Sequence, residues 1–430
     1  MGSGVDWTKL PPELLESISE YLKLYTDYLS FRAVCRCWRS STPKTPFHLP
    51  PQLPWLMLPP SQSHQPLRAF YDLSANKLRF LPVPESSNPD KRHCGSSHGW
   101  LVILDESPSI LLLNPLSRAK LHLPPLSSFP NVHSFNYSRI GKEYSLLSPS
   151  GDPYTRNLRQ MRDSFIKKIV LSDNPSKELR FVAVAILNQT GELAYCRNGE
   201  DSWRFIPGAQ SYSEDVIYCK GLFYAVDKQG GIVICDVNHD SPRVSFVRMW
   251  SQVGGDLQYL INSGDELLLV TRHLDLEFSF EADQSYLVYR TERFDVARLV
   301  WIEPHWERVK SLHDKMVFIG ENSSLSLSAR DFTGCRGDCI YFTDDYSESN
   351  YDGAFGEHDI GIYKLWDGSF EPLPCYPRNS LFRLRWPTPL WKDPEVVTRL
   401  LIGERNTVES ALGKLAEKQR QQIQERGDGR

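Results

Sequence analysis

The stretch GWLVILDESPSILLLNPLSRAKLHLPPL (residues 99–126) holds three short apolar runs that are separated by turn residues. The first run ends at Asp105, the second at Asn114 and the third at Pro124. Apolar runs of this length, bounded by clusters of Asp, Ser, Asn and Pro, are typical of strands joined by tight turns. The stretch therefore predicts a small antiparallel sheet whose last strand ends at a Leu beside Pro.

A similar unit recurs along the chain, and this repetition predicts the fold. Clear copies begin at Phe181 and Gly221, diverged copies begin at Glu266 and Cys339, and a fragment begins at Leu67. Small sheets that repeat at intervals of this kind stack around an axis as the blades of a propeller. We therefore predict a mainly β protein with a six-bladed β-propeller, or with five or seven blades. A pair of β-sandwiches is the alternative, because it also uses short strands.

The N-terminal stretch VDWTKLPPELLESISEYLKLYTDYLSFRAVCRCWRSSTPKTP (residues 5–46) has a helical period. Apolar residues fall on one face from Leu14 to Leu22, and Thr8 is the expected N-cap of this helix. A second helix, with Asp27 as its expected cap, should carry the apolar residues between Phe31 and Trp38. A segment this short cannot bury so many large side chains within itself. We expect part of it to meet another surface; the alternative is a helix pair that only caps the larger domain.

Residues 47–66 separate the helical stretch from the repeats and are rich in proline, with the apolar island WLML at 55–58. Proline at this density favours a semi-rigid extended chain, so we expect a spacer whose island packs on a neighbouring domain. The expected divisions are a helical domain at 5–46, a linker at 47–66, a propeller at 67–391 and a helical, polar tail at 392–430.

Composition excludes several classes of protein. A chain of 430 residues with 40% hydrophobic and 24% charged residues is typical of globular proteins. Its net charge of −4 gives no excess of positive charge that would favour binding to nucleic acid. The sequence shows neither a signal peptide nor an apolar run long enough to span a membrane. We therefore expect an intracellular protein of the cytoplasm, the nucleus or both. The nine cysteines are scattered without a CxxC pair and should be free thiols.

Several segments resemble a known family. Leu10-Pro11, Glu13-Leu14-Leu15 and the run from Phe31 to Arg39 are similar to the F-box motif. The order of this motif, the Pro-rich linker, the block at 99–126 and the block KGLFYAVD at 220–227 resembles the plant F-box proteins with a KIB-type β-propeller. The resemblance covers residues 5–391, whereas the tail departs from the family pattern.

This resemblance implies a function. The F-box would bind the Skp-type adaptor, and through it a cullin, in a Skp–cullin–F-box ubiquitin ligase, while the propeller binds an unknown protein substrate. The chain would then be a non-catalytic substrate-recognition subunit. The adaptor contacts implied by the motif are Leu10, Pro11, Leu14, Leu15, Ile18, Leu22, Phe31, Val34, Cys35 and Trp38.

The acidic segment TDDYSESNYDGAFGEHD (residues 343–359) is the part of the sequence most similar to a catalytic site. Paired carboxylates can hydrolyse glycosides, and oxygen-rich loops can bind calcium, but the EF-hand spacing and the common catalytic motifs are absent. We therefore predict no catalytic residue, cofactor or metal, and an exposed loop that contacts the substrate. The predicted contacts are Asp344, Asp345, Tyr346, Tyr351 and Asp352.

Two alternatives remain open from the sequence. The chain could be a propeller hydrolase that uses the acidic segment, in which case the carboxylates should converge on the central channel. It could also be a protein-binding scaffold whose F-box-like helices do not join a ligase.

Overall fold

The computed structural model of the protein describes most of the chain. The described residues are 6–43, 46, 48–49, 52–58, 66–87, 91–176, 180–188, 190–239, 241–247, 249, 253–281, 284–332, 335–345, 359–375 and 390–392. The predicted tail at 392–430 lies outside them apart from its first residue. No helix in these ranges is long and apolar enough to cross a bilayer.

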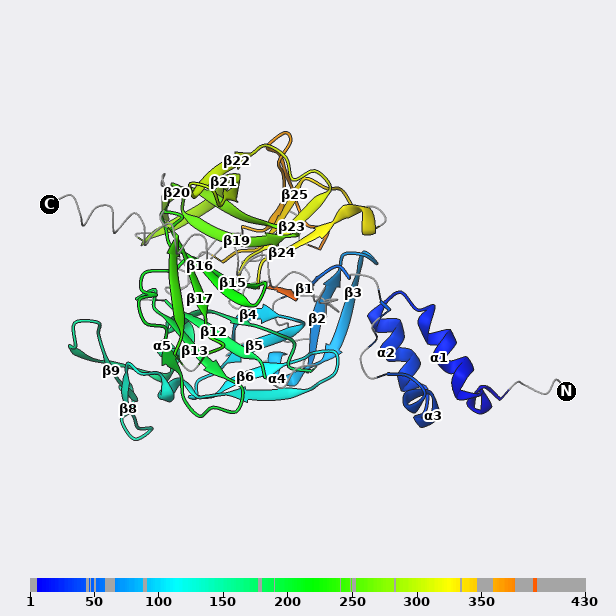
Figure 1. The fold of residues 1–430 in the computed structure, drawn as a ribbon. Helices are drawn as coiled ribbons and strands as arrows, with labels where there is room; N and C mark the ends of the chain where they lie inside the picture. Colours follow the sequence, from blue (N-terminus) through cyan, green and yellow to red (C-terminus); the bar gives the residue numbers. More distant parts are fainter. Residues whose placement is uncertain are drawn as a thin grey trace, which may run out of the picture.

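Within these ranges, six sheets of four or five strands surround a common axis (Figure 1). Blade 1 contains β28 (Leu390–Lys392), β1 (Trp55–Met57), β2 (Leu67–Asp72) and β3 (Lys77–Pro82). Blade 2 contains β4 (Arg92–Ser97), β5 (Trp100–Leu104), β6 (Ile110–Leu113) and β7 (Lys120–Leu123). Blade 3 contains β11 (Ile166–Leu171), β12 (Val182–Leu187), β13 (Leu193–Arg197) and β14 (Arg204–Phe205).

The second half of the ring is built in the same way. Blade 4 contains β15 (Asp215–Cys219), β16 (Leu222–Val226), β17 (Ile232–Asp236) and β18 (Arg243–Val247). Blade 5 contains β19 (Leu257–Ser263), β20 (Glu266–Glu281), β21 (Gln284–Val300) and β22 (His305–Val309). Blade 6 contains β24 (Leu325–Ser328), β23 (Lys315–Ile319), β25 (Cys339–Phe342), β26 (Gly361–Lys364) and β27 (Phe370–Glu371). The prediction of a mainly β propeller is confirmed.

The predicted repeats correspond to the outer three strands of most blades. The block at 99–126, for example, forms β5, β6 and β7, whereas the innermost strand of that blade is β4. All six residues of β4 are buried, polar ones included, because neighbouring blades cover it on both sides. Four of these six residues are polar, so β4 is not the apolar run by which the sequence pattern identified the other strands of this blade.

Strand β28 closes the ring by pairing antiparallel with β1, with Met57 opposite Leu390 and Trp55 opposite Lys392. Blade 1 therefore combines strands from both ends of the propeller. Residues 55–57, which we expected in the spacer, are instead a strand of this blade. Apolar residues flanked by proline can form a short strand or an edge strand when a neighbouring strand provides backbone hydrogen bonds.

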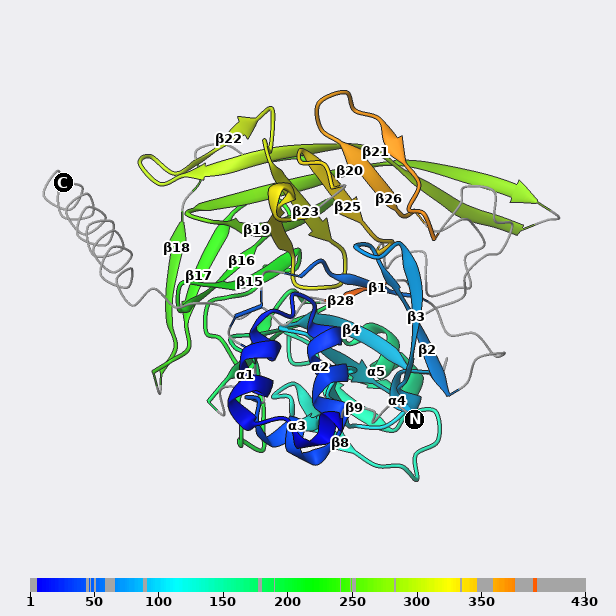
Figure 2. The ribbon, with the colours of Figure 1, turned by 90° about the vertical axis from the view of Figure 1, so that its right-hand side faces the viewer.

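The strand directions define two faces of the ring. The innermost strands β4, β11, β15 and β19 lie beside one another around the axis, and we call the face where they begin the upper face. In each blade the second strand runs antiparallel to the first, so it begins at the opposite, lower face. Because β1 is a second strand, the N-terminal helical domain joins the propeller at the lower face. Figure 2 views the ring from this side, with the helices in front.

An insertion lies between blades 2 and 3. It contains the helical turn η3 (Leu126–Ser128), a sheet of β8 (Val132–Phe135), β9 (Tyr144–Leu147) and β10 (Pro153–Arg156), and helix α5 (Leu158–Ser164). Phe129 stacks on Trp203 of blade 3 at 4.7 Å, and Tyr144 and Leu146 are fully buried. The insertion is therefore packed on the propeller through a shared core. It connects a last strand to an innermost strand and so belongs to the upper face.

Ring closure generates a prediction about stability. The Trp391 side chain of β28 is completely buried, and its ring meets Phe318 at 5.2 Å and Tyr341 at 6.2 Å. We expect Trp391→Ala to lower the free energy of unfolding by about 3–5 kcal/mol, because it leaves a large cavity at the closing strand. The control is Trp366→Ala on the surface of blade 6, where half of the side chain is exposed and a loss below about 1 kcal/mol is expected. Equal losses in chemical denaturation would contradict this role.

Candidate functional site

The helical domain begins with the turn η1 (Trp7–Lys9), followed by α1 (Pro12–Glu20), α2 (Tyr25–Ala33) and α3 (Arg36–Ser40). Three details differ from the sequence analysis. Asp6, whose carboxylate accepts the Thr8 amide at 3.2 Å, caps η1, while Thr8 lies inside that turn. The N-cap of α2 is Leu24, and Asp27 lies in its first turn. The expected second helix is divided at Cys35, whose extended backbone and sulfur cap α3.

A small core holds these helices together. Leu15 and Tyr28 are completely buried and Phe31 is nearly so. The Phe31 ring packs against Trp38 at 4.4 Å, and the Trp38 indole N–H donates to the Trp7 carbonyl at 3.1 Å. Leu15 and Phe31, which the F-box motif marks as contacts, therefore shape the domain from inside and are not available at its surface.

The opposite side of α1 is apolar and exposed. Leu14, Ile18 and Tyr21 follow one another at helical spacing, and each is largely accessible to solvent. Trp7, Leu24 and Val34 add three more exposed large apolar side chains. We call these six residues the apolar surface. The F-box motif in the sequence marks Leu14, Ile18 and Val34 but not the other three residues, although Tyr21 continues the same helical period.

The chain that leaves α3 is fixed to α2. The Tyr28 hydroxyl donates to the Pro43 carbonyl at 2.6 Å, and the Arg32 guanidinium donates to the same carbonyl at 2.7 Å. Further on, the Gln52 side chain donates to the Lys23 carbonyl at 2.9 Å. These contacts fix both ends of the segment between the helices and β1.

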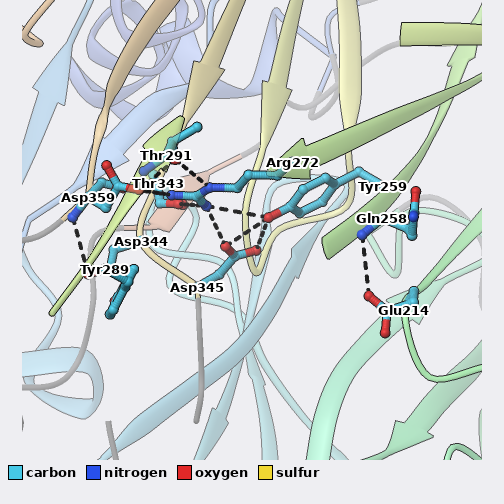
Figure 3. Close-up of polar contacts among 10 residues, drawn as sticks. All are labelled: Glu214, Gln258, Tyr259, Arg272, Tyr289, Thr291, Thr343, Asp344, Asp345 and Asp359. Atoms are coloured by element: carbon cyan, nitrogen blue, oxygen red, sulfur yellow. Dashed lines mark hydrogen bonds and ion pairs between the residues drawn. The ribbon is translucent and has the colours of Figure 1, made fainter. Parts of the chain in front are cut away.

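A second candidate is a buried polar cluster around Arg272, shown in Figure 3. The guanidinium of Arg272 donates to the carboxylate of Asp345 at 2.9 Å, to that of Asp359 at 2.8 Å and to the Thr291 hydroxyl at 2.8 Å. Tyr259 also donates to Asp345, at 2.9 Å. Arg272 itself is fully buried and lies over the Phe342 ring at 5.0 Å. The cluster joins blade 5 to the chain segments that flank β25 and β26 of blade 6.

This cluster corrects the expectation of an exposed acidic loop at its two described ends. Asp344 is buried and bonds to the Tyr289 hydroxyl, while Asp345 is occupied by Arg272 and Tyr259. Asp345 does line the cavity at the upper face, as a hydrolase would require, but it is occupied by a charged and a hydroxyl partner from blade 5. Tyr346, Tyr351 and Asp352 lie outside the described residues, so their predicted role as substrate contacts is untested.

A small cavity lies at the upper face beside this cluster. Its charged lining residues are Arg92, Lys167, Lys168, Glu214, Asp215, Glu321 and Asp345. The cavity measures about 20 Å³, which suits one or two ordered waters and is too small for a sugar ring. Among the described residues, no group of His, Cys, Asp or Glu is arranged to hold a metal ion.

Asp215 connects four blades at the wall of this cavity. It pairs with Lys168 of blade 3 at 2.5 Å and accepts the Leu260 amide of blade 5 at 3.0 Å. It also accepts the Ser324 hydroxyl, which precedes the innermost strand of blade 6, at 3.2 Å. One carboxylate thus satisfies donors from three neighbouring blades.

Glu321 is a buried carboxyl group in the cavity wall whose pKa is raised. Burial raises its pKa to about 7, and the nearby Asp345 and Asp344 act in the same direction, while Arg92, 3.8 Å away, opposes them. The arrangement therefore favours a protonated Glu321 below neutral pH.

Comparison with known proteins matches both parts of the chain. A family model described as KIB1-4 beta-propeller matches residues 70–364, and a model described as F-box-like matches residues 7–45. The chain belongs to the F-box proteins with a KIB1-4 β-propeller.

Curated proteins from Arabidopsis thaliana are similar to this chain along most of their length. F-box protein SKIP23 is 30% identical over 429 residues, covering 94% of this chain and 99% of that protein. F-box protein At2g17036 is 27% identical over 405 residues, covering 90% of this chain and 95% of that protein. The similarity therefore includes the helical domain and the propeller together.

The Arg272 cluster gives a test of blade packing in this F-box protein. Arg272→Ala leaves two buried carboxylates without their cation, so we expect the free energy of unfolding to fall by about 3–5 kcal/mol. The matched control is Arg298→Ala on β21, because Arg298 makes two ion pairs with half-exposed glutamates and is itself half exposed. That loss should stay below about 1 kcal/mol. Similar losses for both variants in urea titrations would contradict the assigned role.

Glu321 gives a test that depends on pH. A pKa raised from 4.5 to about 7 means that the folded chain holds this proton more tightly than the unfolded chain does. The contribution of Glu321 to stability therefore declines as the pH rises from about 4.5 to about 7 and is constant outside that window. We expect Glu321→Gln to become more stable than the wild type across this window, by roughly 2–3 kcal/mol at its upper end. A difference between Glu321→Gln and the wild type that stays flat across this window would refute the assignment.

Proposed function

We propose that this F-box protein is the non-catalytic substrate-recognition subunit of a Skp–cullin–F-box ubiquitin ligase. The observation that carries the proposal is the exposed apolar surface on a helical domain that matches the F-box-like model. The domain already has its own core of Leu15, Tyr28 and Phe31, and the six exposed side chains are not part of that core. A partner that covers them removes apolar area from water, which is the main driving force of association.

The proposed adaptor contacts follow from exposure. Of the residues marked by the motif, those with accessible side chains are Leu10, Pro11, Leu14, Ile18, Leu22, Val34, Cys35 and Trp38. To these we add Trp7, Tyr21 and Leu24, which complete the apolar surface. Leu15 and Phe31 act indirectly, because they fix the helix orientations that bring this surface together.

The two faces of the propeller separate the two binding tasks. The helical domain joins at the lower face, whereas the cavity and the insertion belong to the upper face. A protein substrate bound at the upper face would leave the adaptor surface uncovered. The chain would then act by proximity, holding its target near a ubiquitin-charged enzyme without supplying an acid, a base or a nucleophile.

The contacts in the channel favour this proposal over a propeller hydrolase. A hydrolase needs a carboxylate that is free to act on substrate, whereas Asp345 is bonded to Arg272 and Tyr259. The adjacent cavity is also too small for a saccharide. A scaffold without ligase function differs from our proposal only in failing to bind the adaptor, so an adaptor pull-down separates the two.

The apolar surface predicts which substitutions abolish adaptor binding. We expect Leu14→Asp to weaken binding of purified Skp-type adaptor at least about 100-fold, because it places a charge within the contact. Leu78→Asp on blade 1 is the control, since the exposed fractions of Leu14 (51%) and Leu78 (48%) are nearly equal. Both variants should keep the wild-type melting temperature. The interface is wrong if Leu14→Asp binds as tightly as Leu78→Asp in calorimetric titrations.

A further inference from the structure

The loop between β8 and β9 exposes a large apolar side chain that no described residue covers. Ile140 is 91% exposed, the highest value among the large apolar side chains in the described part of the chain, and Tyr137 is 58% exposed. We call Tyr137, Arg139, Ile140 and Lys142 the tip. Figure 1 shows β8 and β9 projecting from the body of the propeller, on the side away from the helical domain.

The tip is held in one conformation by its own backbone. The Asn136 amide donates to the Glu143 carbonyl at 2.8 Å, and the Lys142 amide donates to the Arg139 carbonyl at 2.9 Å. Gly141 has a φ of +82°, which a residue with a side chain rarely adopts. These bonds close a compact turn that places Ile140 at its apex.

The tyrosine of the tip is also fixed. Its ring packs edge-on against Phe135 at 4.6 Å, and Phe135 in turn meets the buried Tyr144 at 4.6 Å. The tip is therefore supported by the shared core of the insertion. A binding partner would not have to order this ring, so less conformational entropy would be lost on association.

The charge of the tip is positive. Arg139 and Lys142 are both exposed, and neither forms an ion pair with a residue that the structure describes. From Asn131 to Leu147 the sequence contains a single acidic residue, Glu143. Its carboxylate accepts the Gly141 amide at 2.8 Å and thus takes part in holding the turn. Two free cations therefore flank an exposed isoleucine.

From these contacts we propose that the tip docks an acidic segment of the protein substrate, with an apolar side chain of that segment covering Ile140 and Tyr137. This inference rests on the proposed function and names the chemistry of its target. Aromatic and Arg side chains are enriched among residues that dominate binding energy, and the tip carries both. Opposite charges flanking the apolar contact would steer the encounter and fix the orientation of the segment.

The position of the insertion agrees with this role. It joins the last strand of blade 2 to the innermost strand of blade 3, so it emerges at the upper face, opposite the entry of the helical domain. A substrate held at the tip leaves the apolar surface of the F-box accessible to the adaptor. Both contacts can therefore form on one molecule at the same time.

The test uses the full chain and a peptide array in which Leu or Phe is flanked by Asp and Glu. A matched array carries Asn and Gln in place of the acids, and phosphatidylserine vesicles provide an anionic surface without peptide. We expect fluorescence anisotropy to detect binding of acidic peptides only, weakening as salt is raised. Ile140→Asp and the double variant Arg139→Glu/Lys142→Glu should each reduce this affinity at least about tenfold. Ile302→Asp is the control, because Ile302 is 81% exposed on a turn of blade 5, and it should bind as the wild type does.

Three results would overturn the inference: equal binding of acidic and neutral peptides or of neither, undiminished binding by Ile140→Asp, or binding to vesicles in place of peptides. Adaptor binding is measured on the same preparations. If the tip does not bind acidic peptides but the proposed function is right, the wild type and all variants still bind the adaptor. If the proposed function is wrong, the wild type itself does not bind the adaptor, whatever the peptide array shows.

Discussion

The pairing of β28 with β1 is the constraint on which the rest of the propeller depends. A ring of blades protects its strand edges only when the first and last blades meet, and here a single sheet contains strands from both ends of the propeller. The three residues of β28 close the ring, and the buried Trp391 side chain holds this strand in place. Without them β1 would have an open edge, and β4, which lies next to β28, would lose a neighbour.

Charged groups complement this closure by specifying how the blades are arranged. Apolar faces can pack in many ways, whereas Asp215 is satisfied only when Lys168, Leu260 and Ser324 reach it from three other blades. Arg272 of blade 5 is likewise paired only when Asp345 and Asp359 of blade 6 reach it. Burying such ions costs desolvation, which short hydrogen-bonded contacts offset. The Arg272 contacts occupy Asp345 and Asp359 of the acidic segment, the part of the sequence that was most similar to a catalytic site.

Much of the architecture could be predicted from local pattern, and the failures have physical causes. The second and third strands of blade 2, β5 and β6, are apolar runs that end in turn residues, so the sequence of the block at 99–126 predicted them. Innermost strands such as β4 are covered on both sides and carry polar residues, and partners of Arg92 and Ser97 are more than 70 residues away in sequence. Asp345 looked like a solvated acid because its partner Arg272 is 73 residues away in sequence. The break at Cys35 depends on a side-chain cap that helical periodicity does not encode.

The place of β28 in the chain also matters during synthesis. The helical domain is translated first and has its own core, so it can fold while the ribosome is still producing the blades. The ring can close only after Leu390–Lys392 have emerged. A chain released before that point would carry the surface proposed for the adaptor without a closed propeller. Such a fragment would compete with intact molecules for the adaptor while delivering no substrate, which makes complete translation a condition of useful assembly.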